Sequence, residues 1–259
     1  MSGFNAEWLA LREPADAVAR SRRLVSFVVA GAASAGRLLD LGGGTGANIR
    51  YLSPHLPSPQ HWTLVDSERA LLARVPAGTT GVCADLNDVI DDEEMFRDCA
   101  LVTASALLDL VSDDWLRRLV EQCRTAHAAV LFALNYDGRI ECAPADPEDD
   151  DVRRLVNEHQ RTDKGFGPAL GPEAGKRFIE LLSAAQYDVR YERSDWMLGV
   201  ESRELQRQLI DGWVSAAADV APDRRRQFDD WRRRRLEHLD SNHSRIVVGH
   251  IDVAGVRVV

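Results

Sequence analysis

The stretch Arg37-Leu38-Leu39-Asp40-Leu41-Gly42-Gly43-Gly44-Thr45-Gly46-Ala47-Asn48 decides the fold of this chain of 259 residues. It is a short apolar run that ends in an acid, then a turn rich in glycine, then residues that favour a helix from Ala47 onward. This order predicts a strand, a tight turn and a helix. Glycines in such a turn let backbone N–H groups approach a ligand that a Cβ would push away. We therefore expect an α/β fold with a ligand site at this turn.

Two classes of ligand use a turn of this kind. The dinucleotide fingerprint G-x-G-x-x-G/A can be placed on Gly42, Gly44 and Ala47. An acid about 20 residues further on, which that fingerprint also requires, is available in Asp66. A nicotinamide-dependent oxidoreductase is therefore one interpretation of the turn.

A second pattern, acid-x-Gly-x-Gly-x-Gly, is filled without a mismatch by Asp40, Gly42, Gly44 and Gly46. Here the chain resembles the class I S-adenosylmethionine-dependent methyltransferases, whose first motif has this form. A carboxylate below the turn repels a pyrophosphate, whereas it attracts the ammonium group at the methionine end of S-adenosylmethionine. Asp40 therefore favours S-adenosylmethionine as the cofactor, and the resemblance places Asn48 among its contacts.

The resemblance also implies roles for residues at the ends of the next strands. Asp66, at the tip of the second predicted strand, would accept hydrogen bonds from both ribose hydroxyls, with Ser67 beside it. Asp85, after the third strand, would accept from the adenine amino group, and the backbone N–H of Leu86 would reach the ring. Ser105 ends the fourth strand at the same edge of the sheet. These residues complete the predicted cofactor site.

The implied fold is α/β: a Rossmann-like, seven-stranded, mostly parallel sheet with helices on both faces and an antiparallel C-terminal strand. The strands are expected at 37–41, 61–66, 81–87 (with the exit of the strand), 100–105, 128–134, 187–193 and 245–253. Residues 1–34 should form N-terminal helices, broken around Pro14, with Asp16 capping the second of them. Helical inserts at 141–171 and 194–242 complete a single domain and would act as a lid.

Composition limits the classes of function. With 45% hydrophobic residues the chain can bury a full core, and its net charge of −9 argues against a main role in nonspecific nucleic-acid binding. No apolar run approaches the roughly 18 to 20 residues that a membrane span needs, and the start lacks the regions of a signal peptide. A cytoplasmic protein is expected. The four cysteines have no spacing typical of zinc or disulfide frameworks, so no metal site is predicted.

Substrate contacts are expected from the N-terminal helices, the fifth strand and the first insert. Arg12 is a candidate contact for a carboxylate of the cofactor or substrate, or else a solvated surface residue. The fifth strand delivers Asn135 and Tyr136 to the ligand edge. His159, in the first insert, can take a proton from a substrate hydroxyl or amine, as can Tyr136, or else it is a surface histidine.

The second insert contains an arginine-rich stretch at 224–236 with two aromatic residues. RNA binding uses such a stretch for phosphates and stacking. The alternative is a helix whose buried face holds Phe228, Trp231, Leu236 and Leu239 and whose arginines form the solvated face. The acidic stretch 146–151 in the first insert should begin a helix, since acids suit helix N-termini.

The predicted function is methyl transfer to an oxygen or nitrogen atom of a small molecule. The small molecule is reached by elimination, because the chain has neither an N-P-P-Y-type tetrad nor the cysteine pair typical of RNA cytosine methylation. An oxidoreductase and a noncatalytic binding or dimerisation protein that keeps the fold remain alternatives, because fold does not fix function. A homodimer is left open.

Overall fold

The computed structural model describes residues 5–31 and 36–258. The strands are β1 (Arg37–Leu41), β2 (His61–Asp66), β3 (Thr80–Cys83), β4 (Cys99–Ser105), β5 (Ala129–Ala143), β6 (Tyr187–Arg193), β7 (Trp196–Leu198) and β8 (Arg245–Arg257). The longer helices are α1 (Ala6–Ala19), α2 (Arg22–Gly31), α3 (Ala47–Leu52), α7 (Asp113–Thr125), α8 (Asp149–Gln160), α9 (Ala174–Ala184), α10 (Arg203–Val220) and α11 (Arg225–Asp240). Short helical turns are η1 (Ser53–His55), α4 (Arg69–Leu72), α5 (Leu86–Val89), α6 (Glu93–Phe96), η2 (Leu108–Leu110), η3 (Gly171–Glu173), η4 (Val200–Ser202) and η5 (Pro222–Arg224).

The strands form one sheet in the order β3-β2-β1-β4-β5-β8-β6. Strands β1 to β5 pair in parallel, and β8 runs antiparallel between β5 and β6. The predicted seven-stranded, mostly parallel sheet with an antiparallel C-terminal strand is therefore confirmed. The short strand β7 adds an eighth, since it pairs with the outer half of β8. Parallel strands place their carboxyl ends at one edge, where the ligand site was predicted.

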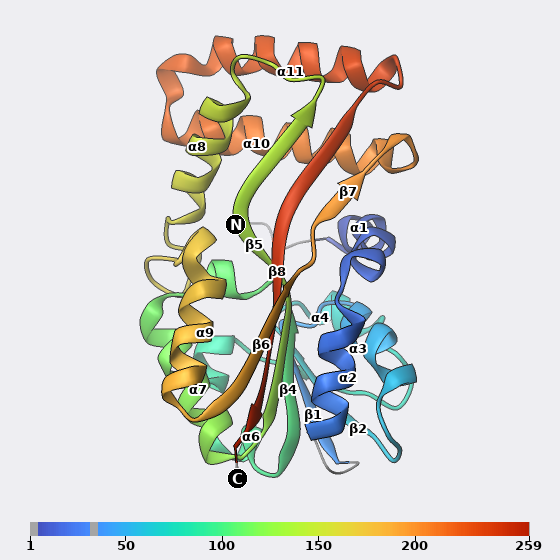
Figure 1. Cartoon of the computed structure of the whole chain (residues 1–259), viewed down its shortest axis with the longest axis vertical. Coiled ribbons are helices and arrows are strands. Elements are labelled where there is room, and N and C mark those ends of the chain that lie inside the picture. The colour runs from blue at the N-terminus through green and yellow to red at the C-terminus, as the bar shows by residue number, and fades with distance from the viewer. Residues whose placement is uncertain (1–4, 32–35, 259) are drawn as a thin grey trace.

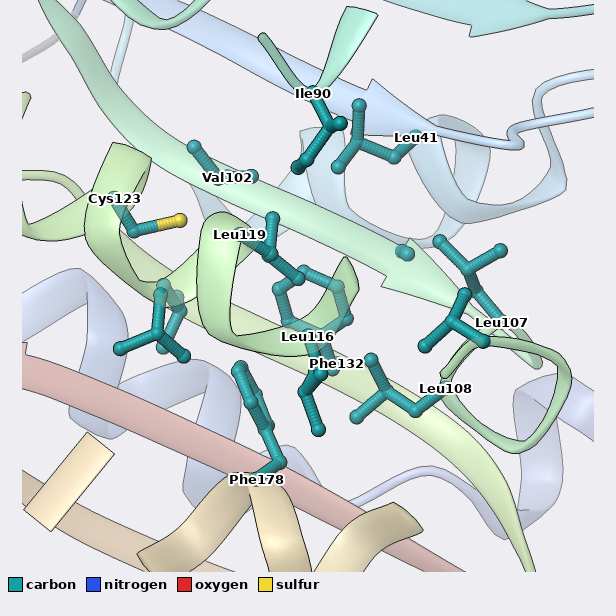
Figure 2. Close-up of a cluster of buried hydrophobic side chains, with 14 of the residues drawn as sticks. Leu41, Ile90, Val102, Leu107, Leu108, Leu116, Leu119, Cys123, Phe132 and Phe178 are labelled. Atoms are coloured by element: carbon teal, nitrogen blue, oxygen red, sulfur yellow. The ribbon is translucent and has the colours of Figure 1, made fainter. Parts of the chain in front are cut away.

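Helices cover both faces of the sheet (Figure 1). On one face α7 and α9 bury the largest core cluster, in which Leu116 and Leu119 of α7 meet Phe132 of β5 and Phe178 of α9 (Figure 2). On the other face α2 and α3 cover a second cluster that includes Leu24 and Val28. Burial of the sheet on both faces explains why β4 and the first six residues of β5 are nearly continuous apolar runs.

A helical unit of α8, α10 and α11 lies at one end of the molecule, where the long strands β5 and β8 extend beyond the rest of the sheet (Figure 1). It has its own core cluster, which includes Trp213, Phe228 and Trp231. Both strands are longer than predicted. The expected strand 128–134 ends at Leu134, which has a φ of 55°, but the side chain of Asn135 donates to Phe132 O and Ile251 O at 2.9 Å, and the strand continues past this irregularity.

The N-terminal helices differ from the prediction. α1 runs unbroken through Pro14, and the chain turns instead at Arg20, whose ψ of 143° is extended. A proline inside a helix removes one hydrogen bond, but packing of the apolar side of α1 against the helical unit offsets that loss. Asp16 therefore does not cap the second helix; it lies buried inside α1. The expected helical range 1–34 extends at both ends outside the described residues.

The arginine-rich stretch forms α11, and Phe228, Trp231 and Leu239 are buried, as the helical alternative predicted. Leu236 is only partly buried, and Arg235, expected on the solvated face, is 1% exposed. Many of its arginines pair with acids. Arg234 binds Asp146 at 2.6 Å and Glu148 at 2.8 Å, so the acidic stretch before α8 pairs with it. In the described part of the chain, no helix combines the length and apolar character needed to cross a membrane.

Candidate active site

The glycine turn between β1 and α3 needs glycine for two separate reasons. Gly42, Gly44 and Gly46 have φ values of 61°, 56° and 81°, in the left-handed region that side chains disfavour. Gly43 has an ordinary φ, but a Cβ there would lie 2.5 Å from an oxygen of Asp40 and 2.6 Å from Leu64. The turn therefore packs tightly onto β1 and β2 while its backbone faces the carboxyl edge of the sheet.

A small cavity of about 50 Å³ opens on one side of this turn. It is lined by Leu9, Arg12, Asp16, Gly42, Gly43, Gly44, Thr45, Ala47, Asn48 and Ser105. These residues come from α1, the turn, the start of α3 and the end of β4. The structure thus brings together four elements that the sequence analysis connected only by resemblance.

A larger cavity of about 200 Å³ opens on the other side of the turn. Its lining consists of Gly42, Asp66, Ser67, Asp85, Leu86, Asn87, Lys164, Gly165 and Phe166. Gly42 lines both cavities, so they adjoin at this residue along the ends of the parallel strands; we call the pair the cleft and the two cavities its smaller and larger parts. All the predicted residues at the tips of β2 and β3 lie in this larger part.

The loop after α8 closes the larger part of the cleft. The side-chain amide of Asn87 donates to Gly165 O at 2.9 Å, and Phe166 packs edge-on against Trp115 with 5.7 Å between ring centroids. Sequence analysis did not select Lys164, Gly165 or Phe166 as site residues. They lie far from the strand tips in sequence, and only the turn-rich composition of the loop hints at a position over a cleft.

Asp66 links the tip of β2 to the glycine turn. Its Oδ2 accepts from the backbone N–H of Gly44 at 2.9 Å, and its Oδ1 accepts from that of Glu68 at 2.9 Å. Asp85 accepts from the backbone N–H of Asn87 at 2.8 Å and so caps α5. Both carboxylates line the larger cavity, where acceptors for hydroxyl and amino groups are available.

Asp40 lies beneath the turn, is completely buried and lines neither cavity. Its Oδ1 accepts from Asn48 Nδ2 at 2.6 Å, and its Oδ2 has no hydrogen-bond partner. Burial raises the pKa of Asp40 to about 7, against the opposing effects of Asn48 and the Arg20 guanidinium. Arg20 in turn donates to Asn48 Oδ1 at 2.8 Å. Asn48 thus connects a buried carboxyl and a buried guanidinium to the smaller cavity.

The predicted acceptor-side residues are spread more widely. The two amide hydrogens of Asn135 go to backbone carbonyls, as described above. The Tyr136 hydroxyl is buried and donates to Asn157 Oδ1 at 2.7 Å, and burial raises the pKa of Tyr136. His159 Nε2 lies 3.5 Å from a carboxylate oxygen of Asp219, and burial and the Lys164 ammonium lower the pKa of His159. None of the three predicted side chains lines either cavity.

Arg12 is not a free surface residue. Its Nε and Nη2 donate to the two carboxylate oxygens of Asp16 at 2.9 and 3.2 Å, and Asp16 also accepts from the indole N–H of Trp196 at 3.0 Å. Asp109 and His250 are buried nearby. Sequence analysis missed these partners, because they lie in elements far apart along the chain and no motif joins them.

Comparisons with known proteins identify the fold. No family model matches the chain, and no curated protein matches it in sequence. Among solved structures, a cyclopropane-fatty-acyl-phospholipid synthase-like protein of Lactobacillus casei is 13% identical, with 98% of this chain and 94% of that chain covered and a TM-score of 0.58. The cyclopropane synthase MmaA2 of Mycobacterium tuberculosis is 10% identical, with 97% and 94% covered and a TM-score of 0.50.

A phospholethanolamine N-methyltransferase 2 of Haemonchus contortus is 14% identical, with 91% of this chain covered and a TM-score of 0.42. The match covers 52% of that chain, so this chain spans about half the length of that protein. The two matches that cover nearly all of both chains show that this chain has the Rossmann-like fold of the class I S-adenosylmethionine-dependent methyltransferases, as the glycine motif predicted.

Proposed function

We propose that this protein is an S-adenosylmethionine-dependent methyltransferase that acts on an oxygen or nitrogen atom of a small molecule. The observation that carries the proposal is the two-part cleft joined at Gly42. Its larger part has carboxylates at the tips of two successive strands, and its smaller part has a turn of closely approaching backbone. An elongated ligand with a nucleoside at one end and an amino acid at the other fits this division.

The residues present fit the cofactor. Asp66 and Ser67 would hold the ribose, and Asp85 and Leu86 the adenine, because their acceptors and backbone lie in the larger cavity. The methionine end would lie along Gly42 and Gly44, between Asn48 and Ser105, whereas Gly46 of the predicted motif lines neither cavity. When bound, S-adenosylmethionine supplies a methyl group on a sulfonium sulfur, which leaves as a neutral thioether once an in-line nucleophile has taken the methyl.

The chain's own part in the reaction is to hold the acceptor in line, exclude water and remove the proton of the acceptor. Tyr136 and His159 remain the candidates from the sequence for the last role. A chain of contacts connects Tyr136 with the smaller cavity. Its ring is 6.4 Å from that of His250, and the His250 ring is 4.9 Å from that of Trp196. The Arg12 guanidinium, 5.0 Å from the Trp196 ring, belongs to a residue that lines the cavity. His159 adjoins Lys164 of the loop over the larger cavity, with Nδ1 3.4 Å from Nζ.

The turn suits a dinucleotide less well. The Gly44 N–H, which a pyrophosphate would use, already donates to the Asp66 carboxylate. A second carboxyl, Asp40, lies directly below the turn. Two acids beside this backbone oppose a ligand whose central group carries two negative charges.

A small molecule is the acceptor that we propose, because the arginines that nucleic acid would need are largely engaged. Arg224 and Arg234 of the arginine-rich stretch pair with the acids that precede and begin α8. A cytoplasmic location and a homodimer remain predictions of the sequence.

Calorimetric titration of the purified protein with S-adenosylmethionine and S-adenosylhomocysteine, with NAD in parallel, tests the cofactor. We expect saturable binding of the first two and a loss of about tenfold or more in Asp66→Ala, because a hydrogen bond to a charged group contributes about 1.5 to 3 kcal/mol. Asp88→Ala is the matched control, since Asp88 is exposed and lines neither cavity. Binding of NAD alone, or of none of the three compounds, would overturn the proposal. Cofactor binding without methyl transfer to any acceptor would instead favour a noncatalytic role.

A further inference from the structure

Two buried polar atoms beside the smaller cavity lack hydrogen-bond partners. They are Oδ1 of Asp109, which is 6% exposed, and Nδ1 of His250, which is 5% exposed. A buried polar group without a partner costs about 1 to 3 kcal/mol, so such groups call for an explanation. The indole N–H of Trp8 is a third buried atom of this kind, and Trp8 lies one turn before Arg12 on α1.

These groups belong to one cluster, which consists of Arg12, Asp109, Tyr136, Trp196 and His250 and which we call the acceptor cluster. The Arg12 guanidinium lies 5.0 Å from the Trp196 ring, and the Trp196 and His250 rings are 4.9 Å apart. Burial raises the pKa of Asp109, and the backbone N–H of Tyr136 and the charge of Arg12 oppose that effect, so the Asp109 carboxyl lies beside Tyr136. Arg12 also lines the smaller cavity, and α1 covers the cluster.

Counted together with Asp16, the acceptor cluster carries a net charge of one negative. Arg12 is neutralised by Asp16, which binds it through both carboxylate oxygens. His250 is neutral near pH 7, because burial, with a smaller effect of Arg12, lowers its pKa to about 3. Burial raises the pKa of Asp109 only to about 6, so Asp109 is mostly a carboxylate at pH 7, and among the described residues it forms no ion pair within 4.0 Å. A bound carboxylate or phosphate would add a like charge, whereas an N–H or O–H donor would satisfy Oδ1.

The remaining walls of the cluster are aromatic. Trp196, Tyr136 and His250 present three rings, and the ring of Trp8 packs against the same core cluster. Aromatic walls favour planar ligands, and the Trp196 face already holds a cation, since the Arg12 guanidinium lies over that ring. Shape and charge therefore point to the same class of molecule.

We infer that the acceptor cluster binds the methyl acceptor and that this acceptor is a planar amine or phenol, neutral or cationic, whose N–H or O–H donates to Asp109. This inference rests on the proposed methyl transfer and names its substrate class.

Two probes with the same phenol ring test the inference: tyramine, which carries an ammonium group, and 4-hydroxyphenylacetate, which carries a carboxylate. Each is titrated by calorimetry into the full-length protein, with and without saturating S-adenosylhomocysteine. We expect tyramine to bind at least about tenfold more tightly than 4-hydroxyphenylacetate, because the Asp109 carboxylate attracts the ammonium group of the first and repels the carboxylate of the second. Asp109→Asn should reduce this preference to within about twofold. Asp114→Asn, in which the altered carboxylate is 81% exposed, is the control and should retain the preference.

The preference in the unaltered protein is independent of whether Asp109→Asn folds, and the S-adenosylhomocysteine titration of each variant shows that its cleft is intact. Tighter binding of 4-hydroxyphenylacetate, equal binding, binding of neither probe, or a preference that survives in Asp109→Asn would overturn the inference. In each of those cases normal S-adenosylhomocysteine binding would leave the proposed function standing. Selective tyramine binding without S-adenosylhomocysteine binding would support the cluster and sink the proposed cofactor.

Discussion

Replacing Asp40 with asparagine should make the protein more stable at pH 8 and weaken its binding of S-adenosylmethionine. Asp40 is completely buried, and one of its carboxylate oxygens has no hydrogen-bond partner. Burial raises the pKa of Asp40 from 3.8 to about 7. The folded protein therefore holds this proton more tightly than the unfolded chain does.

The sign and size of the effect follow from that difference. A carboxyl whose pKa is raised on folding contributes most to stability below the unfolded pKa near 4, and this contribution is lost as the pH rises to about 7. A difference of about 3 pH units corresponds to about 4 kcal/mol. Asparagine cannot ionise, but its new amide donor would lack a partner, at a cost of about 1 to 3 kcal/mol. The net gain at pH 8 should be about 1 to 3 kcal/mol.

Urea unfolding followed by tryptophan fluorescence between pH 4.5 and 8.5 measures this effect. The free energy of unfolding of the unaltered protein should fall more steeply with pH than that of Asp40→Asn, and the exposed Asp88→Asn should follow the unaltered protein. Parallel curves for Asp40→Asn and the unaltered protein would refute the reasoning. So would lower stability of the variant at pH 8. Calorimetry should also show weaker cofactor binding in Asp40→Asn. A buried group that lowers stability is often kept because it serves function, so its removal should impair binding.

Three further substitutions test other parts of the structure. Asp66→Asn should weaken S-adenosylmethionine binding by about tenfold in calorimetry and cost about 1 to 3 kcal/mol in urea unfolding, because asparagine has one acceptor oxygen for the two backbone N–H groups that Asp66 binds. An unchanged affinity would contradict its assignment to the ribose. Gly46→Ala should cost about 1 to 3 kcal/mol more in urea unfolding than Gly78→Ala. Both glycines have φ above 80°, but only an alanine at position 46 would place its methyl group 2.5 Å from a carbon of Pro76. Equal costs would count against this contact. Arg235→Ala should cost about 3 to 5 kcal/mol in the same assay, because it leaves the partly buried Asp149 without its ion pair, and a loss below about 1 kcal/mol would be inconsistent with that account.

The parts of the site that sequence predicted are those that local motifs specify. The glycine turn and the acids at Asp66 and Asp85 each follow a short apolar run, and parallel strands must bring such positions to one edge. Arg12 and Tyr136 of the acceptor cluster were candidate substrate contacts from the sequence, but Trp196 and His250 had no such signal. Asp109 follows β4, His250 lies in the middle of β8, and Arg12 lies on α1, so only the packing of these elements brings them together.

The differences in fold have similar causes. The apolar run ends at Leu134, so the predicted strand stops there, but β5 continues to Ala143 past a shift in the β5–β8 register. β7 is too short to show alternation on its own. The predicted break at Pro14 is absent from α1, because burial of one side of this helix outweighs the single hydrogen bond that the proline removes.

The long strands β5 and β8 have a consequence for amide exchange with solvent. Their inner halves belong to the sheet cores and their outer halves to the separate core of α8, α10 and α11. Proteins open in cooperative units that follow such cores. We therefore expect the amides of 140–143 and 246–248 to exchange together with those of the helical unit, and those of 130–132 to exchange only on global unfolding. The boundary between two cooperative units of local unfolding would then run across the paired strands β5 and β8. Tyr136 and His250 of the acceptor cluster lie at this boundary.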